Sequence, residues 1–192
     1  MKTPAKLLSI AFLLTGFVAF TQTSNIPEGW FKAGSNPGKY EMGLDNQVYH
    51  DGKYSAFIQS SESEISGFGT LMQTCSAQGF LGKKVKMTGY MKSENVEDWA
   101  GLWLRVDSND SKQPLSFDNM QDRPIKGTTD WTKCEIVLDV PENSSTLNFG
   151  ALLSGTGKIW FDNLSFEVVS DSTESTSPSQ RLETPTNTSF DY

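Results

Sequence analysis

The chain has 192 residues and a formal net charge of −7 at pH 7. An acidic chain repels phosphate backbones and anionic lipid surfaces, so this charge argues against nucleic acids and membrane surfaces as partners. One histidine and two cysteines supply neither a zinc cluster nor an evident Ser-His-Asp arrangement, which argues against the common hydrolytic centres.

Residues 1–21 are expected to be a cleavable signal peptide. A basic start is followed by the apolar run Leu7–Phe20, which is too short to span a bilayer comfortably, and the small residues Ala19 and Thr21 precede a cut before Gln22. Removing this segment takes away two lysines and no acids, so the formal charge changes from −7 to −9. We predict a secreted or periplasmic bacterial protein that is not inserted in the membrane after cleavage. The alternative is an uncleaved membrane anchor.

The chain from 26 to 169 is expected to form one β-domain. Short runs rich in aromatic and β-branched residues alternate with turn signals such as Asp51-Gly52, and no stretch keeps a helical period for more than about two turns. The composition of Ser93–Asp98 suits one short helical turn. Many strands without intervening helices predict an all-β fold, a β-sandwich of the jelly-roll type. The expected strands are Tyr40–Leu44, Ser55–Ser60, Gly67–Ser76, Lys84–Lys92, Trp99–Asp107, Lys133–Val140, Leu147–Leu153 and Lys158–Val169.

The two cysteines, Cys75 and Cys134, both fall inside expected strands. In an oxidising compartment a bridge between them would close a loop of about sixty residues, worth about 4 kcal/mol in the chain-entropy model. Alternatively, each is a small buried hydrophobic residue. The sequence leaves both interpretations open.

The strand that begins at Trp99 has two different faces. Alternate residues from Ala100 to Val106 are apolar and share one face, which is typical of a packed core. Trp99, Trp103 and Arg105 share the opposite face. Flat aromatic rings beside a forked donor suit a polar, disc-shaped ligand such as a sugar ring. In the alternative interpretation a loop or the N-terminal segment covers Trp99 or Trp103, and Arg105 forms a salt bridge with Asp118 or Asp122.

A long irregular loop is expected next in the chain. Loops above a sheet face commonly carry binding groups, and Asp118, Asn119 and Arg123 supply donors and acceptors suited to sugar hydroxyls. We therefore add these three residues to the candidate ligand site. In the alternative interpretation the loop is held by its own hydrogen bonds, with Pro124 fixing the backbone and Trp131 packed in the sandwich.

Residues 170–192 are expected to be a disordered tail. The segment is rich in serine, threonine, proline and acidic residues, and Phe190 and Tyr192 are its only aromatic residues. Such a composition cannot bury enough apolar surface to offset the entropy of ordering.

Five segments together resemble a bacterial domain of the galactose-binding-like jelly-roll type. This domain is similar in plan to the carbohydrate-binding modules that accompany glycoside hydrolases, and versions of it occur attached to bacterial transcription regulators. The resemblance implies a jelly-roll fold and a polar ligand, but this fold hosts many ligands and does not identify one. The segments are Gly67–Gln73, Leu81–Val85, Asp98–Asp107, Phe117–Trp131 and Ile159–Leu164.

The resemblance also implies a structural calcium site away from the ligand. Its ligands would be Asp162 of the final strand, helped by backbone carbonyls and by Glu41 or Asp51, because calcium takes oxygen ligands. The alternative is that Asp162 and Asn163 form a bulge satisfied by hydrogen bonds. No other cofactor is expected.

These observations together predict an exported, non-catalytic module that binds carbohydrate or a similar polar ligand. Stacking on Trp103 or Trp99 with a few hydrogen bonds would give a modest affinity. The alternatives are a structural β-sandwich that docks onto a partner protein, and a small polysaccharide-active enzyme. The acidic residues available to such an enzyme as a carboxylate pair are Glu62, Glu64, Glu94, Glu97 and Asp98.

Overall fold

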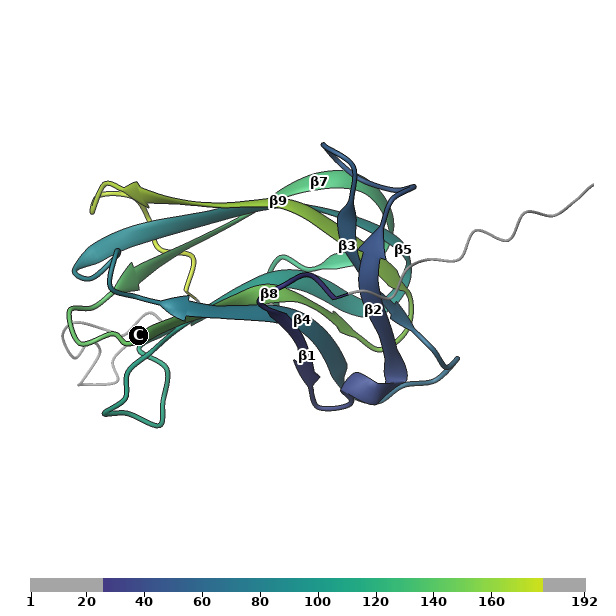
Figure 1. The fold of residues 1–192 in the computed structure, drawn as a ribbon, viewed down its shortest axis with the longest axis horizontal. Helices are drawn as coiled ribbons and strands as arrows, with labels where there is room; N and C mark the ends of the chain where they lie inside the picture. Colours follow the sequence, from purple (N-terminus) through teal and green to yellow (C-terminus); the bar gives the residue numbers. More distant parts are fainter. Residues whose placement is uncertain (1–25, 178–192) are drawn as a thin grey trace, which may run out of the picture.

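The computed structural model describes residues 26–177, which form an all-β sandwich of the jelly-roll type (Figure 1). The predicted fold class is confirmed, and none of the described residues forms an α-helix. The elements are β1 (Trp30–Gly34), the 3-10 helix η1 (Pro37–Lys39), β2 (Tyr40–Asp45), β3 (Ser55–Ser60), β4 (Phe68–Ser76), β5 (Lys83–Asp107), β6 (Ser116–Asp118), β7 (Ile125–Val140), β8 (Thr146–Ser154) and β9 (Lys158–Val169).

The strands form two layers that share one long strand. The hydrogen-bonded order is β1-β4-β8-β5-β9-β3-β2, with β6 and β7 also paired to β5. The first part of β5, residues 84–94, pairs with β9 and, over most of its length, with β7, whereas residues 99–107 pair with β8 and β6. One layer, the β9 layer, therefore holds β2, β3, β9, the first part of β5 and most of β7. The other, the β8 layer, holds β1, β4, β8, the last part of β5 and β6 (Figure 1).

The stretch Ser93–Asp98, expected to form a helical turn, is extended instead. It belongs to β5, where register shifts between Met91 and Ala100 and a φ of 52° at Asn95 accompany the passage of the strand from one layer to the other. Val96 is 3% exposed and pairs with β7. Burial of this side chain and the strand ladder outweigh the local preference for a helix cap.

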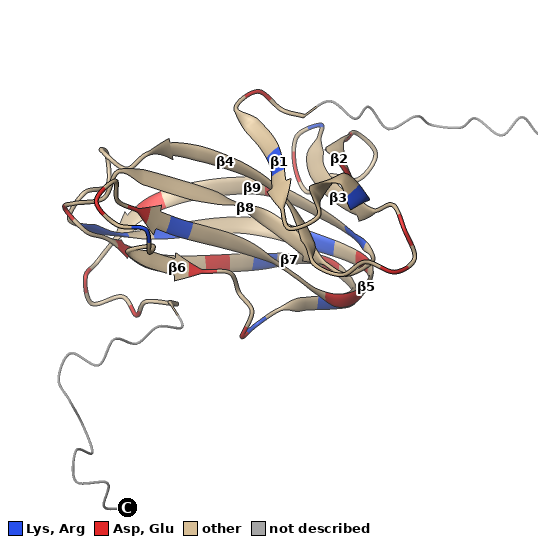
Figure 2. Ribbon diagram, turned by 90° about the horizontal axis from the view of Figure 1, so that it is seen from below, with Lys and Arg blue, Asp and Glu red and all other residues tan. Residues whose placement is uncertain are grey.

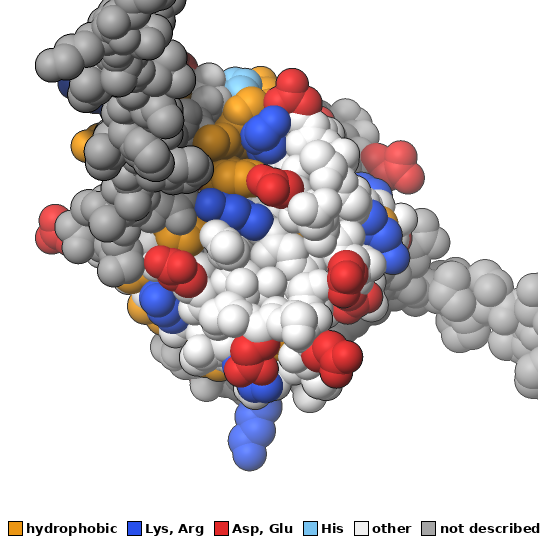
Figure 3. Space-filling view, turned by 90° about the vertical axis from the view of Figure 1, so that its right-hand side faces the viewer, with side chains coloured by type: hydrophobic (Ala, Val, Ile, Leu, Met, Phe, Trp, Pro, Cys, Tyr) orange, Lys and Arg blue, Asp and Glu red, His pale blue; other side chains and the backbone are white. Residues whose placement is uncertain are grey.

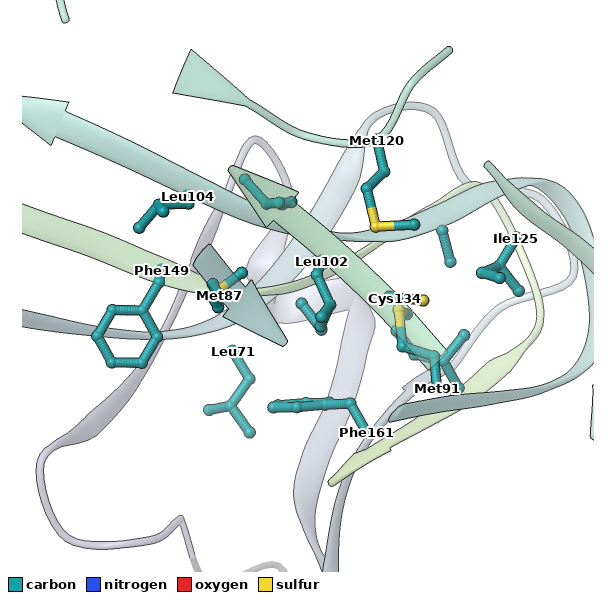
Figure 4. Close-up of a cluster of buried hydrophobic side chains, with 14 of the residues drawn as sticks. Leu71, Met87, Met91, Leu102, Leu104, Met120, Ile125, Cys134, Phe149 and Phe161 are labelled. Atoms are coloured by element: carbon teal, nitrogen blue, oxygen red, sulfur yellow. The ribbon is translucent and has the colours of Figure 1, made fainter. Parts of the chain in front are cut away.

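The core lies between the two layers. Leu102 and Leu104, in the last part of β5, are fully buried, as the alternation of apolar residues predicts. They belong with Leu71, Met87 and Met91 to one buried cluster (Figure 4). Burial of each such side chain contributes about 1.5–3 kcal/mol, so this row fixes which face of the last part of β5 points outward.

The two cysteines are both free. Cys134 is buried on β7, in a row with Ile136 and Leu138, whereas Cys75 is exposed on β4. Burial raises the pKa of the Cys134 thiol to about 11. The bridge that the sequence left open is not formed.

The outer edge of β7 is covered by side chains and by residues 170–177. Thr176 donates its backbone N–H to the Val137 carbonyl at 2.9 Å, and the Val137 N–H donates to Thr176 Oγ1 at 2.8 Å. Arg123 Nη2 donates to the Glu135 carbonyl at 3.0 Å. Exposed edge strands promote unwanted pairing with other chains, so these contacts protect the sandwich along this edge.

Two predictions about the ends of the chain fall outside the described residues. These are the signal peptide, residues 1–21, and most of the expected tail, residues 178–192. In the part of the chain that the structure describes, no helix is long and apolar enough to cross a membrane.

Candidate functional site

A groove with a volume of about 410 Å³ lies on the outer face of the β8 layer, and we call it the outer groove. Two of the strands that line it, β4 and β8, carry no charged residues (Figure 2). Its main apolar lining consists of Phe68, Met72, Trp99, Trp103, Phe117 and Leu152, and its polar lining of Thr70, Arg105, Asn119 and Ser154.

The register of the strands brings these residues together. Trp99 on β5 is opposite Ser154 on β8, and Ser154 is opposite Phe68 on β4. Directly opposite residues share a face of the sheet, so the three side chains form a row across the layer. Trp103 is opposite Gly150, where a Cβ would collide with the Leu71 carbonyl oxygen. The glycine therefore lets the backbone of β4 approach β8 closely at this position.

Trp103 forms a fixed part of the groove floor. Its indole Nε1 passes across β8 and donates to Thr70 Oγ1 on β4 at 2.8 Å, and Thr70 Oγ1 donates to the Ala151 carbonyl at 2.7 Å. Trp103 is only 7% exposed, whereas Trp99 is partly exposed. Trp99 therefore offers the larger accessible ring surface, and Trp103 forms part of the buried floor of the groove.

Arg105 is held by a chain of hydrogen bonds that crosses three strands. Its Nε donates to Asp107 Oδ2 at 2.8 Å, and Asn148 Nδ2 donates to the same oxygen at 2.6 Å. Thr74 Oγ1 then donates to Asn148 Oδ1 at 2.6 Å. The side chain of Arg105 is 45% exposed and lines the groove. Its ionic partner is thus Asp107 on its own strand and not an acidic residue of the following loop.

The loop after β6 borders the outer groove on one side. Phe117 and Asn119 line the groove there. A Cβ at Gly101 would lie 2.8 Å from the Asn119 carbonyl oxygen, so the glycine lets the loop approach β5 between the two tryptophans. Asn119 Oδ1 accepts a hydrogen bond from the Gln121 N–H at 3.1 Å.

Asp118 and Arg123, also expected to bind ligand, are not in the groove lining. Asp118 is fully buried and pairs with Arg123 Nη2 at 2.6 Å, while Arg123 also contacts Asp122 and the Glu135 carbonyl. Burial lowers the pKa of Arg123, but the bonds and charges of Asp118 and Asp122 outweigh this, so its pKa is raised. The pair fastens the loop to β7. Of the six expected ligand residues, the structure brings Trp99, Trp103, Arg105 and Asn119 together.

Asp162, the expected centre of a calcium site, is engaged by backbone donors. Its Oδ2 accepts from the His50 and Asp51 N–H groups at 2.9 and 3.2 Å, and its Oδ1 accepts from the Asn163 N–H at 2.8 Å. Within residues 26–177, no three histidine, cysteine or acidic residues gather as a metal site. Asp162, Glu41 and Asp51 do not form such a group, and calcium binding with the help of backbone carbonyls stays a prediction.

Carboxylates line a second, open depression formed by the β3–β4 loop, the bend of β5 and the β8–β9 turn. Glu64, Glu97 and Asp98 contribute to it. Thr156 Oγ1 donates to Glu97 Oε2 at 2.6 Å, and Ser154 Oγ donates to Asp98 Oδ2 at 2.5 Å. These bonds hold the β8–β9 turn against the bend of β5. Figure 3 shows one end of the molecule, where acidic and basic side chains are interspersed on a mostly uncharged surface.

The sequence did not identify several residues of the groove wall. Phe68, Met72 and Leu152 line it from β4 and β8, and Phe117 lines it from β6. Alternation alone places Phe68 and Met72 on one face of their strand. Which face it is, and which tryptophans lie beside it, depends on long-range pairing that no local pattern reveals.

No family model matches the chain. It is 44% identical over 168 residues to a Bacillus subtilis (strain 168) protein described as an uncharacterized HTH-type transcriptional regulator, YbfP. The match covers 85% of this chain and 57% of that protein, so the chain spans little more than half the length of this relative.

Solved structures share the fold at low sequence identity. The enzymatically active domain of bacteriophage CBA120 tailspike protein 4 matches with a TM-score of 0.57 and 14% identity, over 76% of this chain and 20% of that one. The C-terminal family 22 carbohydrate-binding module of Clostridium thermocellum Xyn10B gives 0.51 and 10%, over 73% and 87%. A Stig cyclase from Fischerella sp. TAU gives 0.54 and 17%, over 77% and 88%. The fold is therefore a β-sandwich like those of carbohydrate-binding modules.

Proposed function

We propose that this chain is an exported, non-catalytic binding module of the galactose-binding-like type, and that its outer groove binds carbohydrate. The observation that carries the proposal is the placement of Trp99 and Trp103 in one groove with Arg105 and Asn119. A sugar ring has an apolar face that stacks on an aromatic ring and a polar rim that needs hydrogen bonds. The export part of the proposal rests on the composition of residues 1–21.

The carbohydrate-binding modules that share this fold support the proposed ligand class. Residues 26–177 contain no α-helix, so the described part of this chain does not hold the helix-turn-helix that the description of the regulator relative names. We expect modest affinity, because one or two stacked rings and a few hydrogen bonds must offset the loss of motion on binding.

Affinity electrophoresis of the full chain in gels containing soluble polysaccharides tests the proposal. We expect retardation on at least one glycan, and we expect Trp99→Ala to abolish it while the thermal midpoint stays within a few degrees of the wild type. Trp131→Ala is the matched control, because Trp131 lies against His50 and lines no part of the outer groove. Absence of retardation on every glycan, or equal retardation of the Trp99→Ala variant, would overturn the proposal.

A second candidate function is docking of a partner protein on the same face. Phe31, next to Met72 across β1 and β4, is 45% exposed, and Phe68 at the groove is 37% exposed. Exposed large apolar side chains near a groove also favour protein contacts. Phe31→Ser separates the two candidates, because Phe31 does not line the groove and its loss should leave glycan binding unchanged.

A further inference from the structure

Residues that line the outer groove carry hydrogen-bond donors without a partner in the described part of the chain. Both Nη groups of Arg105, the Nδ2 group of Asn119 and the indole Nε1 of Trp99 have no hydrogen-bond partner among residues 26–177. A planar guanidinium whose Nε is already held has its two Nη groups left to bind a ligand. Each of these free groups is an N–H and none is an oxygen.

The side-chain oxygens that line the groove are, in contrast, neutral, and each already takes part in a hydrogen bond. Thr70 Oγ1 accepts from Trp103 and donates to the Ala151 carbonyl. Ser154 Oγ donates to Asp98, and Asn119 Oδ1 accepts from a backbone N–H. No aspartate or glutamate is part of the lining. The free Nη groups of Arg105 are therefore the charged hydrogen-bonding feature of the groove lining, and the side-chain oxygens there offer only neutral acceptors.

A groove lined by one cation and no carboxylate distinguishes between kinds of sugar. A neutral sugar offers the guanidinium only hydroxyl oxygens, and the protons of these hydroxyls need acceptors elsewhere. A carboxylate only accepts, and its hydrogen bonds to a guanidinium are charge-assisted and about twice as strong as neutral ones. Resting on the proposed carbohydrate function, we propose that the outer groove recognises a uronic acid, a sugar whose ring carries a carboxylate.

The position of Arg105 supports this assignment. Arg105 donates to Asp107, which Asn148 and Thr74 hold in place through their own hydrogen bonds. The guanidinium is therefore oriented before a ligand arrives, which reduces the entropy lost on binding. Arg105 lies at the end of the groove near its opposite residue Phe117, whereas Ser154, bonded to Asp98, lies at the other end. This charge asymmetry places the carboxylate of the ligand on Arg105 and its ring over the tryptophans.

Calorimetric titration of the full chain with matched pairs of oligosaccharides tests the proposal. The probes are short oligogalacturonides, oligomannuronides and oligoguluronides, each compared with the same oligosaccharide after reduction of its carboxyl groups. We expect at least one acidic member to bind more tightly than its neutral partner by about tenfold or more. Arg105→Gln should remove this preference, so that the acidic member of each pair binds no more tightly than its neutral partner. Arg105→Lys should retain only part of the preference, because lysine cannot bind a carboxylate in two places.

Lys92→Gln is the matched control, because it also removes one cation from an exposed ion pair, with Asp130, but on the β9 layer. Equal binding of acidic and neutral partners, with Trp99→Ala still abolishing both, would overturn the uronate proposal and leave the carbohydrate function standing. No binding of any oligosaccharide in these titrations or in the polysaccharide gels would overturn both. Binding of a free aromatic carboxylate such as benzoate through Arg105, without binding of any oligouronide, would show a carboxylate site that is not a sugar site.

Discussion

The outer faces of the two layers carry similar residues but differ in what covers them. On the β9 layer, Trp160 is 4% exposed, its Nε1 donates to Asp45 Oδ2 at 2.8 Å, and Lys158 Nζ lies 4.6 Å from its ring centre. On the β8 layer, Trp99 and Trp103 border a groove. A tryptophan beside a cation on an outer face is therefore a structural cluster in one layer and a candidate ligand site in the other.

The connecting loops also differ between the two faces. The loop of residues 46–54 is anchored on the β9 layer, where Asp162 accepts from the His50 N–H at 2.9 Å and the His50 ring stacks on Tyr90 with centroids 3.8 Å apart. On the β8 layer, the loop after β6 reaches β5 at Gly101 and forms a wall of the groove. What distinguishes the two faces is where a loop is fastened, and composition does not reveal this.

The largest effect expected from this comparison is on stability. Trp160→Ala removes a buried ring and the indole donor to Asp45, so the free energy of unfolding should fall by about 3–5 kcal/mol, with glycan binding by the folded fraction unchanged. Trp99→Ala should lower it by about 1 kcal/mol and abolish glycan binding, because that ring is partly exposed. Urea unfolding of both variants measures the contrast. Equal losses of stability would mean that both faces are covered cores.

The next effect separates two arginines that the sequence assigned to the same site. Arg123→Ala leaves the fully buried Asp118 carboxylate without its cation, so the free energy of unfolding should fall by about 3 kcal/mol. Arg105→Ala breaks an exposed pair and should cost less than about 1 kcal/mol. Chemical denaturation compares the two. If Arg123→Ala unfolds like the wild type but no longer binds glycan, Arg123 belongs to the ligand site after all.

The fold was more predictable from the sequence than the site. The buried row of β5 could be predicted, because alternation of side chains is a local property of a strand. Phe68, Phe117 and Leu152 could not be placed with Trp99, since their meeting depends on the register of four strands. Likewise, no local pattern shows that Arg123 reaches a buried carboxylate while Arg105 does not, because both lie among acidic and polar residues in the chain.

A smaller effect is expected from Tyr40, which joins β2 to two turns. Its hydroxyl lies 3.1 Å from the Gly67 carbonyl oxygen and 3.0 Å from that of Gly155. Burial, aided by the charge of Asp98, raises the pKa of Tyr40 from 10.0 to about 12. The pKa of Tyr40 is higher in the folded chain than in the unfolded chain, so the protonated hydroxyl contributes to stability. This contribution is complete below pH 10 and is lost as the pH rises towards 12.

Tyr40→Phe tests this pH dependence. The variant should lose about 1 kcal/mol at neutral pH, where the hydrogen bonds of the hydroxyl are missing. Between pH 10 and 12, however, its stability should decline less steeply than that of the wild type. Urea titrations at several alkaline pH values give both slopes. Parallel curves for the two proteins would show that the hydroxyl titrates as it does in the unfolded chain.

The smallest effect concerns reactivity, and it compares the two cysteines. Burial raises the pKa of Cys134 from 9.0 to about 11, and the side chain is closed off on β7, whereas Cys75 is exposed on β4 and burial raises its pKa by a smaller amount. The thiolate is the reactive form, so iodoacetamide at pH 8 should alkylate Cys75 faster than Cys134 by about tenfold or more. Peptide mapping by mass spectrometry measures both rates, and urea should make them similar. Similar rates in the folded protein would mean that β7 opens readily, and that the contacts of Thr176 and Arg123 along its edge do not close the sandwich there.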